Sequence, residues 1–393
     1  MRETFKGYER KNGYGTRNHI LVIPTVTCSE FTVKRIVGNA SAFYNGDDSK
    51  IKILHNPYGC CQTGKDLEQT TRILINAGLN PNTYGVLVLS LGCESVDYNR
   101  VADAIAKEKP VEFLKIQDSG ARNTRESGVE KLKNMANEAL KVKRTETDLS
   151  NITAALECGG SDYTSGLASN PTVGRVSDWI VQNGGTTIIS EVPEFVGAEH
   201  LYAKRAINDS VGKQVLETVT AFEQKLKDEA NVDFREGQPT PGNIDGGLTT
   251  IEEKSLGAIK KSGTSEVSGV LDYAEIPPSK GHFLMNTPGY DVESVSGKVA
   301  GGANIVMFTT GRGTPTGNII TPVIKITANE DTYKIMDDMI DFNASPIMNG
   351  EETIEHAAER LKALLIDVAN GKLTKAEINE QDDFAIYRVG PTY

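Results

Sequence analysis

The chain has 393 residues, of which 38% are hydrophobic and 24% charged, as is typical of soluble globular proteins with two or three domains. Its formal net charge of −11 has the wrong sign for a nucleic-acid or anionic-membrane surface. It has no transmembrane-length apolar run, no apolar stretch of a signal peptide and only five cysteines, which excludes a disulfide framework. We therefore expect a cytoplasmic protein with free or metal-bound thiols and with no nucleic-acid or membrane partner.

The first third of the chain repeats four times a short apolar run, a polar or glycine-rich turn and an amphipathic segment. The runs predict strands at residues 20–24, 51–54, 85–90 and 111–116. The segments that follow predict helices near residues 30–38, 65–78, 96–108 and 124–142. Apolar strands that alternate with helices are typical of a parallel sheet covered on both faces. We expect a flavodoxin-like α/β domain over residues 1–145.

The polar segment 145–151 lacks helical periodicity and marks the expected domain boundary. Strands are then predicted at residues 153–156, 186–189, 283–285, 304–308 and 322–327, and helices at 173–183, 209–230 and 351–369. Segment 233–249 is a loop rich in Gly and Pro, and loops of this length are uncommon unless they are functional or disordered. We expect residues 146–393 to form a larger catalytic α/β domain with a mainly parallel sheet, and the site to lie in the cleft between the two domains.

All five cysteines lie just after an expected strand, where ligands bind in open α/β sheets. One hypothesis is a site for iron or zinc with soft ligands, built from His55, Cys60, Cys93 and Cys158. The alternative is that these cysteines are small apolar residues at tightly packed strand ends. Because the chain has no Cys-x-x-Cys pair, the sequence does not indicate a zinc knuckle or an iron–sulfur motif.

An acidic stretch follows the expected strand at residues 186–189. It contains Glu191, Glu194, Glu199 and His200. Carboxylates with an imidazole suit Fe(II), Mn(II) or Mg(II). The alternative is the first turn of a helix, where glutamates interact favourably with the helix dipole.

The glycine-rich segment 311–317 matches neither the dinucleotide fingerprint nor the phosphate-binding loop. Thr309, Thr310 and Arg312, together with backbone N–H groups, instead predict an anion nest for a carboxylate. Lys254, which follows the long loop, is either a surface lysine or a base with a depressed pKa. The local sequence by itself favours a surface lysine.

Eight motifs, taken in order, resemble the altronate/galactarate dehydratase family. They are residues 7–18, 59–60, 80–82, 91–94, 158–170, 197–200, 246–257 and 308–313. The resemblance runs from about residue 7 to residue 350. It implies a hydro-lyase that converts hexonic or hexaric sugar acids to 2-keto-3-deoxy acids with a divalent metal, classically ferrous iron.

The residue patterns above and the resemblance together give a set of expected site residues. Expected catalytic residues are Lys254, Glu94 and His200, with Lys254 as a candidate base. Expected substrate-binding residues are Arg17, Asn18, Ser161, Asp162, Thr309, Thr310 and Arg312. Expected ligands of Fe(II), or of Mn(II) or Mg(II), are His55, Cys60, Cys93, Cys158 and Glu191. If the metal binds only oxygen and imidazole, the expected ligands become Glu94, Glu191, Glu199 and His200.

The chain also resembles a sister branch of the family, the sulfolactate sulfo-lyase large subunit, in some stretches. The presence of Cys60, Cys93 and Arg312, however, favours assignment to the dehydratases. Single-chain members of the family begin with a small additional domain, whereas here the shared motifs start at Gly7. We therefore expect a large subunit that has low activity without a separate small subunit and that forms a homo-oligomer. A non-catalytic binding subunit and a nicotinamide-linked oxidoreductase remain alternatives. A binding subunit would bind no metal. An oxidoreductase would need a glycine-rich dinucleotide fingerprint, which this sequence lacks.

Overall fold

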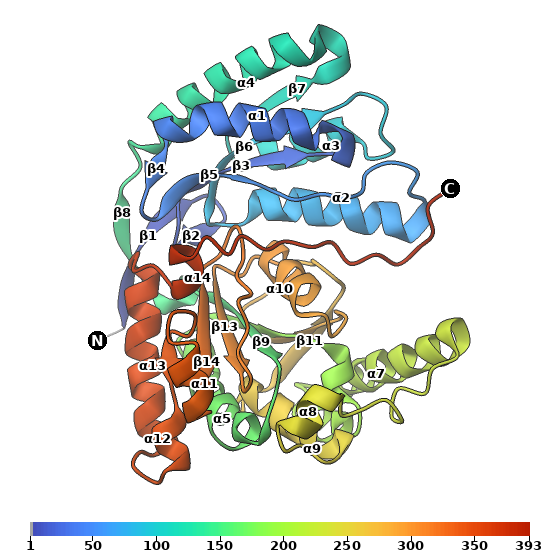
Figure 1. Cartoon of the computed structure of the whole chain (residues 1–393), viewed down its shortest axis with the longest axis vertical. Helices are drawn as coiled ribbons and strands as arrows, with labels where there is room; N and C mark the ends of the chain where they lie inside the picture. Colours follow the sequence, from blue (N-terminus) through green and yellow to red (C-terminus); the bar gives the residue numbers. More distant parts are fainter. Residues whose placement is uncertain (1–2) are drawn as a thin grey trace.

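A computed structural model describes residues 3–393, and residues 1–2, at the start of the expected first domain, lie outside it. Two α/β halves stack on each other, with the N-terminal half above the C-terminal half in Figure 1. Each half contains a mainly or wholly parallel sheet with helices packed against it. The predicted α/β class with two such sheets is confirmed.

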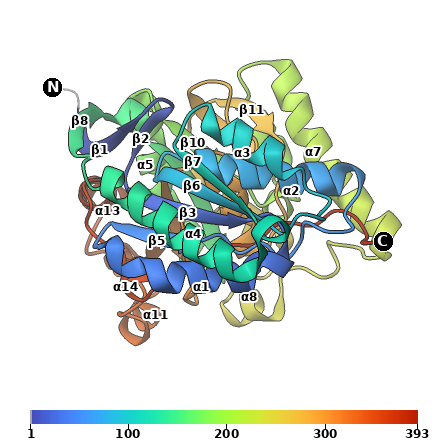
Figure 2. The same ribbon diagram turned by 90° about the horizontal axis from the view of Figure 1, so that it is seen from above.

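The sheet of the N-terminal half has the strand order β4-β5-β3-β6-β7, and only β4 runs antiparallel to its neighbour. Its strands are β3 (His19–Pro24), β4 (Asn45–Gly46), β5 (Ser49–Ile53), β6 (Thr83–Ser90) and β7 (Val111–Lys115). Its helices are α1 (Glu30–Ala40), α2 (Gly64–Leu79), α3 (Tyr98–Ala106) and α4 (Ile116–Ala139). Helices α1 and α4 lie over the outer face of the sheet, as Figure 2 shows from above. The four strands and four helices predicted here are confirmed, with their ends shifted by a few residues.

The C-terminal half contains a seven-stranded parallel sheet with the order β11-β12-β10-β9-β13-β14-β15. Its strands are β9 (Thr153–Gly159), β10 (Thr186–Ile189), β11 (Val267–Leu271), β12 (Gly281–Met285), β13 (Ile305–Thr310), β14 (Val323–Thr327) and β15 (Phe342–Asn343). Its longer helices are α5 (Asn170–Gln182), α7 (Asp209–Ala230), α9 (Ile251–Ala258), α10 (Asp291–Ala300) and α13 (Ile354–Ala369). Its shorter helices are α6 (Glu199–Ala203), α8 (Pro241–Asp245), α11 (Glu330–Ile335), α12 (Ser345–Met348) and α14 (Lys375–Ile378).

The sequence did not predict edge strands β11 and β15 or helix α10. Helix α10 buries Ser294, Ser296 and Lys298 along with its valines, so the sequence lacks the contrast between an apolar and a polar face that indicates a helix. Helix α7, by contrast, buries Val211, Val215 and Val219 on one stripe, as predicted, and its far end projects beyond the body of the protein (Figure 1).

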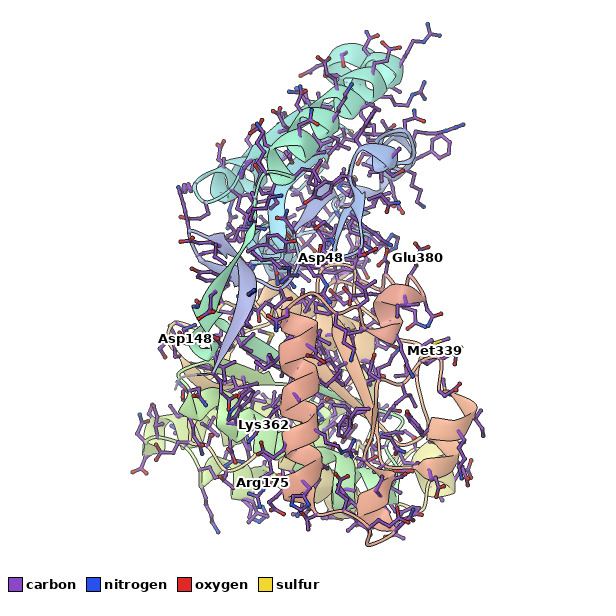
Figure 3. The ribbon with its side chains drawn as sticks, turned by 90° about the vertical axis from the view of Figure 1, so that its left-hand side faces the viewer. Asp48, Asp148, Arg175, Met339, Lys362 and Glu380 are labelled. Carbon is purple, nitrogen blue, oxygen red and sulfur yellow. The ribbon has the colours of Figure 1, made fainter. Side chains whose placement is uncertain are left out.

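A third sheet was also not predicted. It consists of the antiparallel strands β1 (Thr4–Arg10), β2 (Gly13–Gly15) and β8 (Arg144–Asp148) in the order β2-β1-β8. Strand β8 falls in the polar segment expected at the domain boundary. Arg144 pairs with Asp48 at 2.6 Å, and Figure 3 shows Asp48 at the level where the two halves meet.

The two halves share one hydrophobic core. Ile73 and Leu74 of α2 belong to the same buried cluster as Val295 and Val299 of α10. The Asn80 side-chain amide, directly after α2, donates to the carbonyls of Val299 and Ala303. The interface between the halves is therefore packed like a protein interior. Within residues 3–393, no helix combines the length and apolar character needed to cross a membrane.

Candidate active site

A cavity of about 340 Å³ opens at the carboxyl ends of β9, β10 and β13, which is where ligands bind in open parallel sheets. Its reactive lining residues are Cys158, Glu191, Glu194, Lys254, Asp291 and Arg312. The predicted loop 233–249 contributes to one wall through Thr240 and Asn243 of the α8 region. The Asn243 amide donates to the Ser161 carbonyl at 2.9 Å, which ties this loop to the end of β9.

The cavity does not lie between the two halves, where we expected the site. Its lining residues fall between residues 158 and 312 and so belong to the C-terminal half. A larger cavity of about 500 Å³ does lie between the halves, but near the amino ends of β9 and β10, at Thr153 and Thr186. None of the predicted site residues lines that larger cavity.

Three carboxylates cluster beside the site cavity. One oxygen each of Glu157, Glu191 and Asp291 lies within 4.8 Å of the others, and this is the only such group of three metal-ligating side chains in residues 3–393. Glu157 lies near the end of β9, Glu191 follows β10, and Asp291 begins α10. Three elements that are distant in sequence therefore bring negative charge to one point.

Glu157 is fully buried, and one of its two oxygens is left free. Oε2 accepts a hydrogen bond from Ser294 at 2.8 Å and forms an ion pair with Lys298, whose side chain is also fully buried. Oε1 has no hydrogen-bond partner among the described residues. Burial, and then the neighbouring charge of Glu191, raise the pKa of Glu157 well above its ordinary value. An unpartnered buried carboxylate oxygen requires a ligand, a cation or a proton.

Glu191 has a left-handed backbone, with φ 65° and ψ 63°. Its Oε2 accepts hydrogen bonds from the Cys158 N–H at 3.0 Å and from the Lys261 ammonium at 2.9 Å. Burial alone would raise the pKa of Glu191, but Lys261 and Lys298 outweigh burial and lower it. Lys261 also donates to Cys158 Sγ at 2.6 Å, and burial raises the pKa of the Cys158 thiol. The Lys261 ammonium therefore contacts both the Cys158 sulfur and the Glu191 carboxylate.

Lys254, on α9, reaches the cavity as predicted, and it is part of an ion pair. Its Nζ lies 3.0 Å from Glu194 Oε1 and 3.1 Å from Gln238 Oε1. The second oxygen of Glu194 is buried and has no partner in the part of the chain that the structure describes. Burial raises the pKa of Glu194, and Glu191 adds to the rise, whereas Lys254 opposes it. Glu194 is therefore a carboxyl group that can hold a proton beside the lysine.

Asp291 and Arg312 complete the charged lining. Burial, and then Glu191 and Glu194, raise the pKa of Asp291 to about 7. Arg312 is exposed at the cavity and has no ion-pair partner within residues 3–393. An unpaired guanidinium at the rim can bind a carboxylate through two parallel hydrogen bonds.

The carboxylate cluster fits a divalent cation better than the predicted thiolate set does. Glu157, Glu191 and Asp291 offer hard oxygen ligands, and the buried Oε1 of Glu157 has no hydrogen-bond partner among the described residues. Oxygen donors of this kind suit Mg(II), Mn(II) or Fe(II). These residues are the ones that could hold a metal.

The structure does not bring the other predicted soft ligands to this cluster. His55, Cys60 and Cys93 follow strands of the N-terminal sheet, whereas Cys158 belongs to β9 of the C-terminal sheet. His55 is exposed and its Nδ1 lies 3.1 Å from Glu30. Cys60 and Cys93 are also exposed. Among the described residues, none of these three side chains shares a group of metal-ligating atoms with Glu157, Glu191 and Asp291.

Two predicted catalytic residues also lie away from the cavity. Glu94 follows β6 and accepts hydrogen bonds from Thr25 at 2.5 Å and from the Gly92 N–H at 2.7 Å. Burial would raise the pKa of Glu94, but these hydrogen bonds hold it below its ordinary value. His200 is exposed on α6, and neither residue is part of the cavity lining.

Arg17 and Asn18, predicted to bind substrate, are buried in the framework. Both guanidinium edges of Arg17 are used, by Glu377 and by the carbonyls of Thr16, Val368 and Lys372. The Asn18 amide donates to the Tyr44 hydroxyl and to the Ala139 carbonyl.

Of the other predicted substrate residues, only Ser161 and Arg312 line the cavity, and the rest are hydrogen-bonded within the surrounding structure. Asp162 accepts from Thr164, Ser165 and Asn329, so both of its oxygens are occupied. The Thr309 hydroxyl donates to Asn170 at 2.6 Å. Ser161 lines the cavity, and the Thr310 hydroxyl accepts from a backbone N–H in the turn that carries Arg312.

Sequence reasoning missed Glu157, Lys261, Asp291 and Lys298. Two of them could have been found. Glu157 lies inside an apolar strand and Lys298 inside a segment of small and apolar residues, and a charged side chain in such a place is not buried without a partner. Asp291 carries no such signal, since an aspartate at the start of a helix is common for other reasons.

Comparisons with known proteins match almost the whole chain. The family model described as D-galactarate/altronate dehydratase, C-terminal, matches residues 149–392. The model described as D-galactarate dehydratase/altronate hydrolase, second domain, matches residues 7–140. An altronate dehydratase of Bacillus subtilis is 38% identical over 399 residues, covering 99% of this chain and 78% of that protein.

Two further relatives differ in name and length. The (2R)-sulfolactate sulfo-lyase subunit beta of Chromohalobacter salexigens is 37% identical over 389 residues, which cover 98% of this chain and 97% of that subunit. The galactarate dehydratase (L-threo-forming) of Escherichia coli is 35% identical over 385 residues, which cover 94% of this chain and 73% of that protein.

Proposed function

The chain belongs to the D-galactarate/altronate dehydratase family, and from this premise we propose that it is a hydro-lyase that removes water from a sugar acid to give a 2-keto-3-deoxy acid. The observation that carries the proposal is the cavity of the C-terminal half. There the carboxylate cluster, the Lys254–Glu194 pair and the unpaired Arg312 lie together. The names of the dehydratase relatives support this reaction class.

The reaction sets three chemical requirements. The proton on C2, beside a carboxylate, is weakly acidic, so its removal needs a base and stabilisation of the negative charge that develops. The hydroxyl on C3 needs a proton in order to leave as water. The substrate carboxylate must also be held in an acidic protein, which requires a local positive charge.

The residues of the cavity can meet each requirement. Arg312 binds the substrate carboxylate, because its guanidinium is at the rim and unpaired. The Lys254 amine and the Glu194 carboxyl group lie 3.0 Å apart, so a proton can pass from Lys254 to Glu194. The Lys254 amine then takes the C2 proton, and the Glu194 carboxyl donates its proton to the departing hydroxyl. The ammonium and the carboxylate are restored once both protons have moved.

We further propose that Glu157, Glu191 and Asp291 hold a divalent cation, Fe(II) or else Mn(II) or Mg(II). When bound, the cation would supply Lewis-acid stabilisation of negative charge on the substrate. Ion pairs with Lys261 and Lys298 orient Glu191 and Glu157, respectively.

A substrate screen tests the proposal. We expect the purified chain, supplied anaerobically with Fe(II), to form a 2-keto-3-deoxy acid from at least one aldonic or aldaric acid, detected as its semicarbazone. Chelation should abolish turnover and added Fe(II) should restore it, because the cluster loses its cation and regains it. No product from any acid, with or without a small partner subunit, would contradict the proposal.

The sulfolactate sulfo-lyase reaction is a second candidate, because the relative of that name is a subunit that this chain matches at 97% of its length. That name also supports a separate partner subunit for this chain. Release of sulfite from sulfolactate in the same screen, without any keto acid from sugar acids, would favour this second function.

The role of Arg312 gives a separate prediction. Arg312→Gln should raise the KM for the sugar acid about 10–100-fold and change kcat little, because it removes charge-assisted hydrogen bonds to the substrate carboxylate. The matched control is Arg175→Gln, an exposed arginine labelled in Figure 3 that pairs with Glu355 on α13. Steady-state kinetics measure both variants. An equal KM for the two would show that Arg312 does not bind the substrate.

A further inference from the structure

Helix α10 presents three functional side chains on one face. Asp291, Ser294 and Lys298 are spaced by three and four residues, which places them on the same side of the helix. Asp291 belongs to the carboxylate cluster. Ser294 and Lys298 both contact Glu157 Oε2. One helix thus supplies a member of the cluster and also the two groups that orient another member.

Ser294 is also the centre of a buried hydroxyl hub, which consists of Ser190, Thr287 and Ser294. The Ser294 Oγ lies 2.7 Å from Ser190 Oγ, and the Thr287 hydroxyl donates to it at 3.1 Å. Thr287 Oγ1 accepts the backbone N–H of Glu191 at 2.9 Å. The hub therefore connects the side chain of Glu157 with the backbone of Glu191.

The number of protons and lone pairs fixes the direction of these bonds. A serine hydroxyl has one proton to donate and two lone pairs that accept. Because the Ser294 proton goes to Glu157 Oε2, Ser294 accepts from Ser190; the single proton of Thr287 is shared between Ser294, at 3.1 Å, and the Pro288 carbonyl, at 3.0 Å. Oε2 of Glu157 is then occupied by Ser294 and Lys298, while the buried Oε1 keeps no partner among the described residues. The hub leaves that single oxygen available.

We propose that Ser294 is a positioning residue that fixes Glu157 and Glu191 in the arrangement in which they hold a divalent cation. The inference rests on the proposed function and adds a residue that does not touch the cation. Groups that orient ligands in this way change metal affinity when they are removed, even though they make no bond to the metal.

The test compares two serines of the same helix. Ser296 is as fully buried as Ser294, but its Oγ accepts from the Ala385 N–H at 3.0 Å and so is bonded to a different segment. Mn(II) alone is titrated calorimetrically into the full chain, so the readout does not depend on turnover. Ser294→Ala should weaken Mn(II) binding about 10–100-fold, and Ser296→Ala should leave it unchanged.

Two more variants show whether a loss of Mn(II) binding reflects the missing hydroxyl or misfolding of the Ser294→Ala protein. Thr287→Val removes the hydroxyl that holds the Glu191 backbone and should weaken Mn(II) binding in the same direction. Ser294→Cys keeps a weak donor of similar shape and should retain part of the affinity that Ser294→Ala loses. Thermal unfolding of each variant separates lost affinity from lost structure.

The outcomes distinguish this inference from the proposed function. Equal Mn(II) affinity of wild type, Ser294→Ala and Thr287→Val would overturn the inference and leave the dehydratase proposal intact. A wild-type chain that binds no Mn(II) but forms a keto acid would overturn the cation site and this inference with it. A wild-type chain that binds Mn(II) but converts no acid would contradict the reaction alone.

Discussion

Lys254→Ala is expected to lower turnover about 10²–10⁴-fold, the usual contribution of a general base, without reducing metal content. The lysine lines the cavity, and its Nζ lies 3.0 Å from Glu194 Oε1, close enough for a proton to move between them. Lys254→Arg should not restore turnover, because a guanidinium does not give up its proton in this pH range. Steady-state kinetics and Mn(II) titration measure the two effects separately.

Lys260→Ala is the matched control for this prediction. Lys260 follows Lys254 by six residues, is exposed and does not line the site cavity. It should retain wild-type turnover. If Lys254→Arg retains near-normal turnover, Lys254 serves only as a positive charge toward the substrate carboxylate. The base would then be Glu194, since the earlier candidates Glu94 and His200 lie outside the cavity.

Arg17→Met is expected to lower the free energy of unfolding by about 3–5 kcal/mol and to leave the KM of the folded protein unchanged. The side chain of Arg17 is fully buried, and its Nε and Nη2 donate to the two carboxylate oxygens of Glu377 at 2.5 and 2.8 Å. Its removal leaves the Glu377 carboxylate and the carbonyls of Val368 and Lys372 without these donors. Urea denaturation with linear extrapolation measures the loss.

Arg122→Met is the corresponding control, because Arg122 is exposed on α4. Surface substitutions of this kind change stability by no more than about 0.5 kcal/mol. A stable Arg17→Met protein with a raised KM would show instead that Arg17 binds substrate, as the sequence motif first indicated.

The parts of the fold that follow from local patterns were predicted from the sequence. Strands β3 and β6 are continuous apolar runs because both of their faces are buried, and such runs are visible without knowing their neighbours. Strands β1 and β8 were missed because they are partly exposed and polar. Strand β1 pairs with β8 across more than 130 residues of chain and with the short β2 across a two-residue turn. The pairing of β1 with β8 cannot be read from either segment alone.

The site was predicted in part, for a related reason. Cys158 and Glu191, indicated by the rule that ligands bind beyond strand ends, line the cavity together with Arg312, indicated by the glycine-rich segment, and Lys254, indicated by the family resemblance. The same rule applied to the N-terminal sheet indicated Cys60 and Cys93, because the sequence shows that a residue follows a strand but not which residues of the other sheet lie beside it. Motif residues such as Arg17 look alike whether they bind a substrate or hold the framework together.

The left-handed backbone of Glu191 sets stability against function at a single position. A non-glycine residue in this conformation costs on the order of 1–3 kcal/mol, a strain that glycine would relieve. Yet this position supplies a carboxylate of the cluster, together with the acceptor for Lys261 and for the Cys158 N–H. Selection for a more stable chain and selection for the carboxylate therefore favour different amino acids here, which is the usual origin of a trade-off between stability and activity.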